Sequence, residues 1–441
     1  MKRLAYILAF LLCCIPVVIF SQSEEELKEY FDEGQYFFNR GDYEDALVYY
    51  LKLVTARPKN ANYNFKVGEA YLNIPGKEHL AIPYFVASLD KVVSKQAYRR
   101  RSFEESAAPL HAYFYLGNAY RMNNQLNEAL ECYAKFIDSP YFYNNYNLNV
   151  VDREIKSCER AKIIQDAPVN FERINLGENI NSGFSEERPV ISADGNTLVF
   201  IRRLQFYDAI FFSRKNGDTW AKAININPQI ISDEDFYPSG LSSDGKILLL
   251  VKREGDSYDL YLSEFDGETW SKARRFSEKV NTIYAETHAS FGPGDDFILI
   301  SSNRPGGRGG FDIWISERLG EDSWSKPKNM GKQINTDQDE QDAFMSSDMN
   351  VLFFSSQDHY TMGGYDIFYT RKAGKKWRIP INIGYPINNT RDNLNYCPSH
   401  QDCREAYLSM TGDDSQGAAD IYLIRITSES IISFKDSALD K

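Results

Sequence analysis

The sequence has few of the side chains from which catalytic and metal sites are usually built. Its five histidines are scattered over 441 residues, at His79, His111, His288, His359 and His400. No H-E-x-x-H or G-x-S-x-G motif occurs, and no group of cysteines and histidines has the spacing of a zinc site. We therefore expect no cofactor, no metal and a function other than catalysis.

Basic residues are scarce relative to acidic ones. The chain has 50 Lys and Arg against 62 Asp and Glu, a formal net charge of −12. Loss of Lys2 and Arg3 with a leader peptide lowers the 50 basic residues to 48 and the charge to −14. Proteins bind nucleic acid through clustered cationic surface and the release of counterions, so this composition argues against a nucleic-acid partner.

The one long apolar run lies at the N-terminus. Lys2 and Arg3 precede the apolar segment Leu4–Phe20, which is followed by Ser21. This arrangement is typical of a secretory signal peptide, so we predict export of the chain and removal of residues 1–21. An uncleaved anchor is the weaker alternative, because the run is short for a bilayer span and contains Pro16.

Cysteine is sparse as well, with six residues in the chain. Cys13 and Cys14 lie in the leader, and Leu12 is a poor neighbour for a lipidation site, so we do not expect a lipid anchor. The other four are Cys132, Cys158, Cys397 and Cys403. An exported chain allows disulfides, but spacing does not fix the pairing, and buried or free thiols are an equal alternative.

A helical repeat is present between residue 24 and about residue 138. Gly34 and Gly68 are 34 residues apart, and Gly117 marks a third copy after a charged insertion that contains Arg99–Arg101. The residues around these glycines that fall at helix contact positions are Tyr30, Phe37, Tyr43, Ala46, Tyr50, Pro58, Tyr63, Tyr71, Ala81, Phe85, Tyr113, Leu116, Tyr120, Ala129 and Tyr133. Small residues let antiparallel helices approach while aromatic rings fill the gaps between them. The pattern resembles the tetratricopeptide repeat, and we predict a solenoid over residues 22–168, capped by a helix at 150–166.

A second repeat begins after Asn170, where the apolar period becomes alternating. Its phase is set by Trp220, Trp270, Trp324 and Trp377, spaced by 50, 54 and 53 residues, and each unit holds about four short strands. Segment 171–182 matches the end of a unit but has no unit before it. We therefore predict a five-bladed β-propeller over residues 169–428, with segment 171–182 completing the fifth blade, and a tail at 429–441.

The S-x-D-G turns and D-I-Y strands of these units resemble the WD-like propeller repeats of TolB-type envelope proteins. Two blades depart from the pattern. The first has Ala209 where the others have Asp, and the fifth has Cys403 where a turn glycine is expected. We expect these two blades to be less regular than the rest.

Residues 301–316, "SSNRPGGRGGFDIWIS", contain four glycines around Arg308. A phosphate-binding loop would open a helix and carry Lys-Ser/Thr, and an RNA-binding Arg-Gly tract would be repeated. We interpret the segment as a blade loop whose glycines supply positive φ. Arg304 and Arg308 are candidate partner-binding residues on this loop.

Four acidic residues are candidates for a binding site at the mouth of the propeller channel. Glu186, Asp235, Glu286 and Glu340 each lie three residues before Pro189, Pro238, Ala289 and Ala343, and the fifth blade has Leu394 in their place. The favoured interpretation is that each carboxylate caps its own loop by accepting backbone hydrogen bonds. The functional alternative is a ring of charge that holds a cationic group, such as a Lys or Arg side chain of a partner.

Two further segments have competing interpretations. The aromatic run 141–147 is a peptide-binding edge or, as we favour, packs against the capping helix. The acidic segment 336–342 has the composition of a cation site but lacks the turn glycine and the terminal Glu of a calcium loop. We expect it to be a solvated loop.

A solenoid followed by this propeller resembles periplasmic scaffold proteins of Bacteroidota envelopes, including the peptidoglycan-linked subunit of the type IX secretion system. Those relatives commonly continue into further domains, among them an OmpA-like one, whereas this chain stops at Lys441, so direct peptidoglycan anchoring is not expected. The resemblance implies a non-enzymatic periplasmic adaptor with envelope proteins as partners, associated only indirectly with the outer membrane or peptidoglycan. The alternatives are a carbohydrate- or peptide-binding receptor and, less favoured, a propeller hydrolase.

Overall fold

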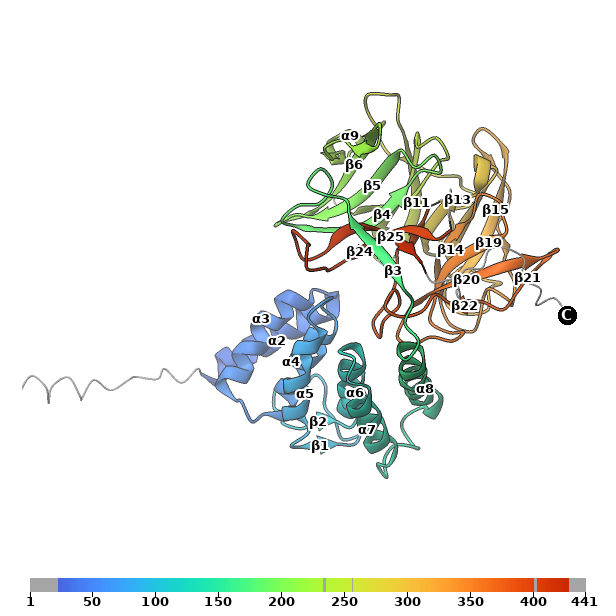
Figure 1. Ribbon diagram of the computed structural model, residues 1–441. Helices are drawn as coiled ribbons and strands as arrows, with labels where there is room; N and C mark the ends of the chain where they lie inside the picture. The colour runs from blue at the N-terminus through green and yellow to red at the C-terminus, as the bar shows by residue number, and fades with distance from the viewer. Residues whose placement is uncertain (1–22, 233–234, 256, 400–402, 428–441) are drawn as a thin grey trace, which may run out of the picture. The chain divides into compact units, whose positions relative to one another are not determined.

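The computed structural model describes residues 23–232, 235–255, 257–399 and 403–427. Contacts divide the chain into two compact units, Met1–Ile155 and Lys156–Lys441. Within the described ranges the first unit is mainly helical, and the second is built of antiparallel sheets (Figure 1). The predicted signal peptide, residues 1–21, and the predicted tail, residues 429–441, lie outside these ranges.

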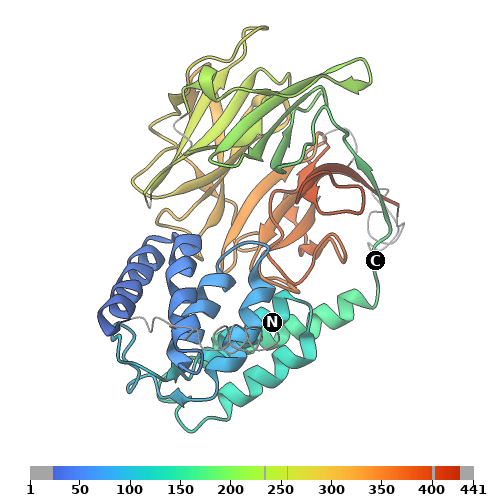
Figure 2. The same ribbon diagram turned by 90° about the vertical axis from the view of Figure 1, so that its left-hand side faces the viewer.

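The first unit is a series of antiparallel helix pairs (Figure 2). Its helices are α2 (Glu24–Arg40), α3 (Tyr43–Ala56), α4 (Ala61–Leu72), the short 3-10 helix η2 (Glu78–Leu80), α5 (Ala81–Ser88), α6 (Ala112–Met122) and α7 (Leu126–Ile137). The first of them begins after Ser23, whose hydroxyl accepts the Glu26 N–H (3.1 Å), and ends at Gly41, with φ 84°. α2 packs on α3, α4 on α5 and α6 on α7, as the repeats predict.

A glycine in the first helix of each pair lies directly against an aromatic ring of the second helix. A Cβ atom at Gly34 would lie 2.5 Å from Tyr50, one at Gly68 2.7 Å from Phe85, and one at Gly117 2.4 Å from Tyr133. Packed interiors leave no room for such an approach, so any larger residue would force the helices apart. The predicted role of these glycines in close helix packing is confirmed.

The charged insertion lies between α5 and α6, and we call residues 90–110 the strap. Its two ends pair as short parallel strands, β1 (Val92–Val93) and β2 (Ala108–Pro109). Just before β2, the Glu105 carboxylate accepts the N–H groups of Ser106 and Ala107 (2.9 and 3.0 Å). These bonds shape the turn within the strap, and the Ala61 N–H donates to the Ser106 carbonyl (3.2 Å), which ties this end of the strap to α4.

Two rings of the aromatic run 141–147 are internal. Phe142 and Tyr146 lie edge-on to Phe136 of α7, with ring centroids 4.9 and 4.7 Å away. Tyr141 and Tyr143 are exposed. Two of the rings therefore pack against α7, and packing of the run against the capping helix stays a prediction.

α8 (Leu148–Gln165), the predicted capping helix, contributes to both units. In its first half Glu154 pairs with Arg121 of α6 (2.9 Å), as expected of a helix that covers the last repeat. In its second half the Ser157 hydroxyl donates to the Gly363 carbonyl of the propeller (3.0 Å). The division between the units thus falls within the helix, earlier than the sequence-based boundary after residue 168.

The second unit contains five antiparallel sheets, the blades of a propeller. Blade 1 consists of β4 (Ser185–Ile191), β5 (Thr197–Arg203), β6 (Asp208–Asn216), β7 (Thr219–Trp220) and β8 (Ile224–Asn225), followed by the short helix α9 (Asn227–Ile230), and blade 2 consists of β9 (Phe236–Leu241), β10 (Ile247–Glu254), β11 (Ser257–Glu264) and β12 (Arg274–Arg275). Blade 3 consists of β13 (Glu286–Phe291), the 3-10 helix η3 (Pro293–Asp295), β14 (Phe297–Ser302), β15 (Asp312–Gly320), β16 (Ser323–Trp324) and β17 (Lys328–Asn329), and blade 4 of β18 (Glu340–Met345), β19 (Val351–Ser356), β20 (Asp366–Ala373), β21 (Lys376–Trp377) and β22 (Ile381–Asn382). Blade 5 consists of β23 (Cys397–Pro398), β24 (Glu405–Met410), β25 (Asp420–Ile426) and the earlier strand β3 (Phe171–Asn175). The first strands of blades 1 to 4 contact one another in turn, which puts them around the central axis.

The ring closes as predicted, with the earliest strand of the unit in its last blade. β3 pairs antiparallel with β25, from Phe171 opposite Ile426 to Asn175 opposite Tyr422, and both figures show the two strands side by side (Figures 1 and 2). This pairing gives the fifth blade its outer strand. Together with the helix pairs, it confirms the predicted fold class: an α-helical solenoid followed by a five-bladed β-propeller.

Four tryptophans fill the joints between neighbouring blades. Trp220 packs in the apolar cluster shared by blades 5 and 1, Trp270 in that of blades 1 and 2, and Trp324 in that of blades 2 and 3. Trp377 packs, partly buried, against the cluster of blades 3 and 4. The 50-residue period in the sequence therefore marks the joint between each blade and the one before it.

Asparagines that follow Ile or Val in the connections tie each blade to the previous one. The side chains of Asn181, Asn281, Asn335 and Asn388 each accept a backbone N–H and donate to the carbonyl of the same residue in the third strand of the preceding blade, at Ile421, Leu260, Ile313 and Ile367, over 2.8 to 3.0 Å. A side-chain amide here replaces a β-ladder partner. The connection from blade 1 to blade 2 has Ile231 at this position, and Asn227 bonds the Ile210 N–H instead (2.8 Å).

The connections between blades lie on the same face as the loops between second and third strands, and we call this the connection face. Its loops are long in blades 3, 4 and 5, at 303–311, 357–365 and 411–419, and short in blades 1 and 2. Blade 5 is irregular as predicted, because its inner strand has only two residues. Blade 1 is not, since its three main strands have seven, seven and nine residues.

Two predictions bear on export. No disulfide joins the four described cysteines, and all but Cys403 are buried, which agrees with the alternative of buried thiols. In the part of the chain that the structure describes, no helix has the length and apolar character needed for a membrane span.

Candidate binding site at the channel mouth

Three of the four predicted acidic residues are fully buried, at the start of the innermost strand of their blades. Glu186, Glu286 and Glu340 each have 0% of their surface exposed. Each carboxylate accepts the N–H and the hydroxyl of the Ser or Thr four residues earlier: Ser182 (3.2 and 2.5 Å), Thr282 (3.0 and 2.7 Å) and Thr336 (2.8 and 2.6 Å). The loop-capping interpretation therefore describes these residues, and an accessible ring of carboxylates is contradicted.

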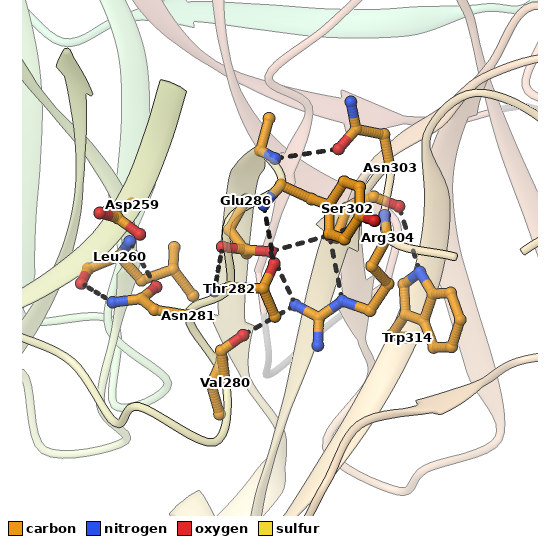
Figure 3. A network of polar contacts seen from close by, with 12 residues as sticks. Asp259, Leu260, Val280, Asn281, Thr282, Glu286, Ser302, Asn303, Arg304 and Trp314 are labelled. Atoms are coloured by element: carbon orange, nitrogen blue, oxygen red, sulfur yellow. Dashed lines mark hydrogen bonds and ion pairs between the residues drawn. The ribbon is translucent and has the colours of Figure 1, made fainter. Parts of the chain in front are cut away.

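Arg304, a predicted partner-binding residue, is part of the same buried arrangement in blade 3 (Figure 3). Its Nη2 donates to Glu286 (3.0 Å) and to the Val280 carbonyl (2.8 Å), and its Nε donates to the Ser302 hydroxyl (3.1 Å). Burial raises the pKa of Glu286 and lowers the pKa of Arg304. With 9% exposure, Arg304 fastens the connection to its own blade and does not reach a partner.

Asp235 is the exception among the four acidic candidates, because it is exposed. Strand register puts Phe236, not Asp235, at the position of the buried glutamates: Phe236 lies opposite Lys252, as Glu186 lies opposite Arg202. The prediction counted back three residues from Pro189, Pro238, Ala289 and Ala343. Strand register shows that Pro238 is one residue out of step with the others. Blade 2 therefore has a buried phenylalanine side chain where blades 1 and 3 have a buried carboxylate.

Blade 5 has an amide at this position. Asn393 accepts the Asn389 N–H (3.3 Å) and donates to the carbonyls of Asn389 and Arg391 (3.0 and 2.9 Å). The predicted counterpart, Leu394, is its neighbour. Sequence reasoning missed this residue, although the signal was available: a Ser, Thr or Asn followed four residues later by a side-chain acceptor.

The glycine-rich loop of blade 3 is a turn, but its glycines serve close packing more than positive φ. Only Gly306 has positive φ, at 94°. A Cβ at Gly307 would lie 1.7 Å from Asp312 at the start of β15, whereas one at Gly309 would lie 1.8 Å from the Gln338 carbonyl of the next connection. The loop is thus pressed against the connection to blade 4.

Arg308 is the accessible residue of this loop. Its backbone N–H donates to Asp312 (2.6 Å), while its half-exposed side chain lies 3.4 Å from the exposed Asp337. An exposed ion pair of this kind contributes little to the stability of the fold, so Arg308 can exchange Asp337 for another acidic group. Partner binding by Arg308 remains a prediction.

A depression of about 530 Å³ lies on the connection face at the starts of the inner strands, and we call it the channel mouth. It is lined by Glu187, Arg188, Ile201, Arg203, Asp208, Asp235, Phe236, Tyr237, Arg253, Tyr258, Thr287, Phe311, Gln341, Asp342 and Leu394. Of the six candidate residues only Asp235 lies here. The accessible charges of the mouth therefore belong mostly to residues that the sequence did not single out.

Side chains around the channel mouth hold one another in place. The Arg188 guanidinium lies over the Tyr237 ring, 4.5 Å from its centroid. The Tyr237 hydroxyl donates to the Thr287 carbonyl (2.9 Å), and the Thr287 hydroxyl donates to Gln341 (3.1 Å). This chain of contacts crosses four blades, so a ligand would meet a polar surface that is already ordered.

Both signs of charge are present in the mouth. Arg203 lies 2.7 Å from Glu187 and 3.7 Å from Asp208. Asp342 accepts the Asn395 N–H (2.8 Å) and faces His288 Nδ1 at 3.4 Å. Burial lowers the pKa of His288, which favours its neutral form at pH 7.

A larger groove of about 900 Å³ lies near the opposite hairpins of blades 2 and 3. Its rim charges are mutually satisfied, since Arg274 binds Glu264 and Asp322 at 2.9 and 3.0 Å. Across the described residues no group of His, Cys, Asp and Glu could hold a metal ion. The acidic segment 336–342 is predicted to be a solvated loop, but only Asp337 of it is exposed, since Asp339 accepts the Phe311 N–H (2.8 Å) and Glu340 caps its own loop. We take the channel mouth as the candidate functional site.

Comparisons with known proteins agree with the two architectures. Residues 111–140, which span the third helix pair, match the tetratricopeptide repeat family model. No curated protein sequence matches the chain.

Among solved structures, TolB from Acinetobacter baumannii is 14% identical with a TM-score of 0.35, over 56% of this chain and 55% of that one. The chain thus spans about half of that protein. A putative TolB from Agrobacterium tumefaciens is 15% identical (TM-score 0.35; 56% and 78% covered), and the catalytic domain of the Coprinopsis cinerea GH62 α-L-arabinofuranosidase is 8% identical (TM-score 0.36; 59% and 98% covered). At these values the likeness says nothing about ligand or activity.

Proposed function

We propose that the chain is an exported, non-enzymatic adaptor of the cell envelope that holds partner proteins together in the periplasm. Its partners are envelope proteins, and its link to the outer membrane or peptidoglycan is through them. The resemblance of its paired architectures to Bacteroidota scaffold proteins favours a role in assembly of the type IX secretion system.

The observation that carries this proposal is the channel mouth. It is an open depression with ordered polar walls, and Asp235 and other charged groups reach solvent at its rim. A hydrolase would need acids free to act on a substrate, whereas Glu186, Glu286 and Glu340 are buried and bound to their own loops. Recognition of a partner side chain needs only the ordered surface.

Capture from crosslinked envelopes tests the proposal with a matched pair of variants. Asp235→Lys reverses an exposed charge in the channel mouth, and Asp218→Lys reverses an exposed charge on the hairpin between β6 and β7, on the opposite face. We expect the first variant to lose protein partners that the wild type and the second variant retain. Equal recovery by all three proteins would overturn the assignment of the site.

A carbohydrate- or peptide-binding receptor is the second candidate. The volume of the channel mouth, about 530 Å³, lies within the range of small-ligand pockets, roughly 300–1,000 Å³. Recovery of a bound glycan or peptide without a protein partner would favour this function, and hydrolysis of a chromogenic substrate panel would favour an enzyme.

A further inference from the structure

Helix α4 is covered on every side along most of its length. All ten residues from Ala61 to Ala70 are buried, polar and charged ones included. Neighbouring helices cover two sides of it, through the contacts of α4 with α3 and with α5. A helix of mixed polarity normally keeps one face in water, and here the strap covers that remaining face.

Three strap side chains reach the face formed by α2 and α4. The Tyr98 hydroxyl donates to Asn62 (2.7 Å), and Arg100 Nη2 lies 3.9 Å from Glu69. The strap's third contact, the ring of Phe103, lies 6.4 Å from Tyr63 and 6.1 Å from Phe31 between ring centroids. The strap thus presents an aromatic residue, a basic residue and a second aromatic residue in the spacing Y-x-R-x-x-F.

The two ends of the strap pair with each other, and its C-terminal end is the buried part. Ala107–Leu110 are buried, and Glu105 caps the turn before them. Residues 94–104, by contrast, include no buried residue, and Arg99–Arg101 are exposed. The described structure therefore divides the strap into a buried base and an outer arm, residues 94–104, whose Tyr98 and Phe103 pack partly buried against the apolar clusters of the solenoid.

Polar groups beneath the arm have hydrogen-bonding capacity that the arm does not use. The Nδ2 of Asn62 and the hydroxyl of Tyr50 are buried without a hydrogen-bond partner. Lys66, 1% exposed, lies in the same region and donates to Gln35 (2.8 Å). Buried polar groups without partners are rare in native proteins, and each one needs a physical explanation; a further hydrogen-bonding molecule at this face would supply one.

We propose that the α2–α4 face is a docking site for an extended segment of a partner protein with the chemistry of the arm, an aromatic-x-basic-x-x-aromatic stretch, and that residues 94–104 occupy it in the isolated chain. Glu69 would receive the basic group and Phe31 with Tyr63 the second ring. Asn62 and Tyr50 would supply bonds that the arm leaves unmade, so a partner segment could outcompete it. The inference concerns the solenoid and does not depend on the channel mouth.

The test uses a fluorescent peptide with the sequence of residues 95–105 and the purified full chain. The variant Tyr98→Ser/Arg100→Ser/Phe103→Ser empties the site while keeping the length and the buried base of the strap. We expect it to bind the peptide at least tenfold more tightly than the wild type, because a tethered arm competes at an effective concentration on the order of millimolar. Adding Glu69→Gln should weaken this binding, and a peptide with the same three serines should not bind.

Each other outcome overturns the inference. A folded variant that does not bind the peptide, or that binds it no better than the wild type, shows that the face is not a docking site. Loss of cooperative helix unfolding in the variant, followed by circular dichroism, shows that the arm is part of the solenoid core and not a removable occupant. The assay needs no envelope partner, so its failure is separate from failure of the proposed adaptor function.

Discussion

Glu340 should make the stability of the propeller depend on pH near neutrality. Its carboxylate accepts bonds from the Thr336 N–H and hydroxyl and from the Ser356 hydroxyl (2.9 Å). Glu186 and Glu286 each pair with an arginine, at 2.6 and 3.0 Å, but within the described residues no basic side chain pairs with Glu340. Burial raises the pKa of Glu340 from 4.5 to about 7.

The direction and size of the effect follow from this pKa. The folded protein binds the Glu340 proton more tightly than the unfolded chain does. The resulting stability is complete below pH 4.5, decreases as the pH rises from 4.5 to 7, and is lost above that. A difference of 2.5 pKa units corresponds to about 3 kcal/mol of unfolding free energy.

Urea unfolding at pH 5 and pH 8 measures this loss in the wild type and in Glu340→Gln. Tryptophan fluorescence reports on the propeller alone, because all five tryptophans lie between residues 220 and 377. The wild type should lose stability between the two pH values by about 2–3 kcal/mol more than Glu340→Gln does, slightly less than the full effect because pH 5 already lies above 4.5. Asp337→Asn, which removes an exposed carboxylate of the same connection, is the control and should behave like the wild type. Parallel pH profiles for the wild type and Glu340→Gln would refute the reasoning.

Three further predictions concern packing and closure. Gly117→Ala should destabilise the solenoid by about 1–3 kcal/mol through its clash with Tyr133, measured by circular dichroism of the helices. The control Ala134→Gly, at an exposed helical site, measures how much an exchange between Gly and Ala changes stability through the helix backbone alone. A Gly117→Ala protein that is more stable than the wild type would contradict the packing argument. Asn335→Ala should cost about 1–3 kcal/mol for each of the two β15 backbone groups it leaves unpaired, and an unchanged tryptophan unfolding midpoint would show that those groups find other partners. Deletion of residues 171–182 should expose the edge of β25 and cause aggregation, whereas a monomer of unaltered stability would mean that the ring closes in another way.

The repeats could be predicted from sequence because each depends on one local interaction repeated at a fixed distance. Gly34 and Gly68 each lie against an aromatic ring of the next helix, and Trp220 and Trp270 fill equivalent positions between neighbouring blades. These contact residues recur at a nearly constant spacing even though the loops between them differ in length. The orphan segment at residue 171 then identified the closing strand without any knowledge of the pairing.

The candidate site was harder to predict, because its residues are brought together by strand register and by burial. Asp235 and Phe236 differ by one position in the sequence, yet one is exposed and the other replaces a buried carboxylate. A shift of one residue moves a side chain to the opposite face of a strand. Arg188 and Tyr237 come from different blades, so no local pattern in the sequence links them. The position of the strap over α4 was likewise not visible, since an insertion has no counterpart in the other repeats.

Closure of the ring by β3 makes the order of synthesis differ from the order of assembly. A chain that emerges N-terminus first presents β3 before any other propeller strand, but its partner β25 is the last described strand of the chain. The first strand must therefore wait while four blades form, and pairings between distant segments are slow because the intervening loop has to be closed. During that interval the edges of β3 and β25 are unpaired, so the time that the ring takes to close sets how long these two edges stay open to wrong pairing.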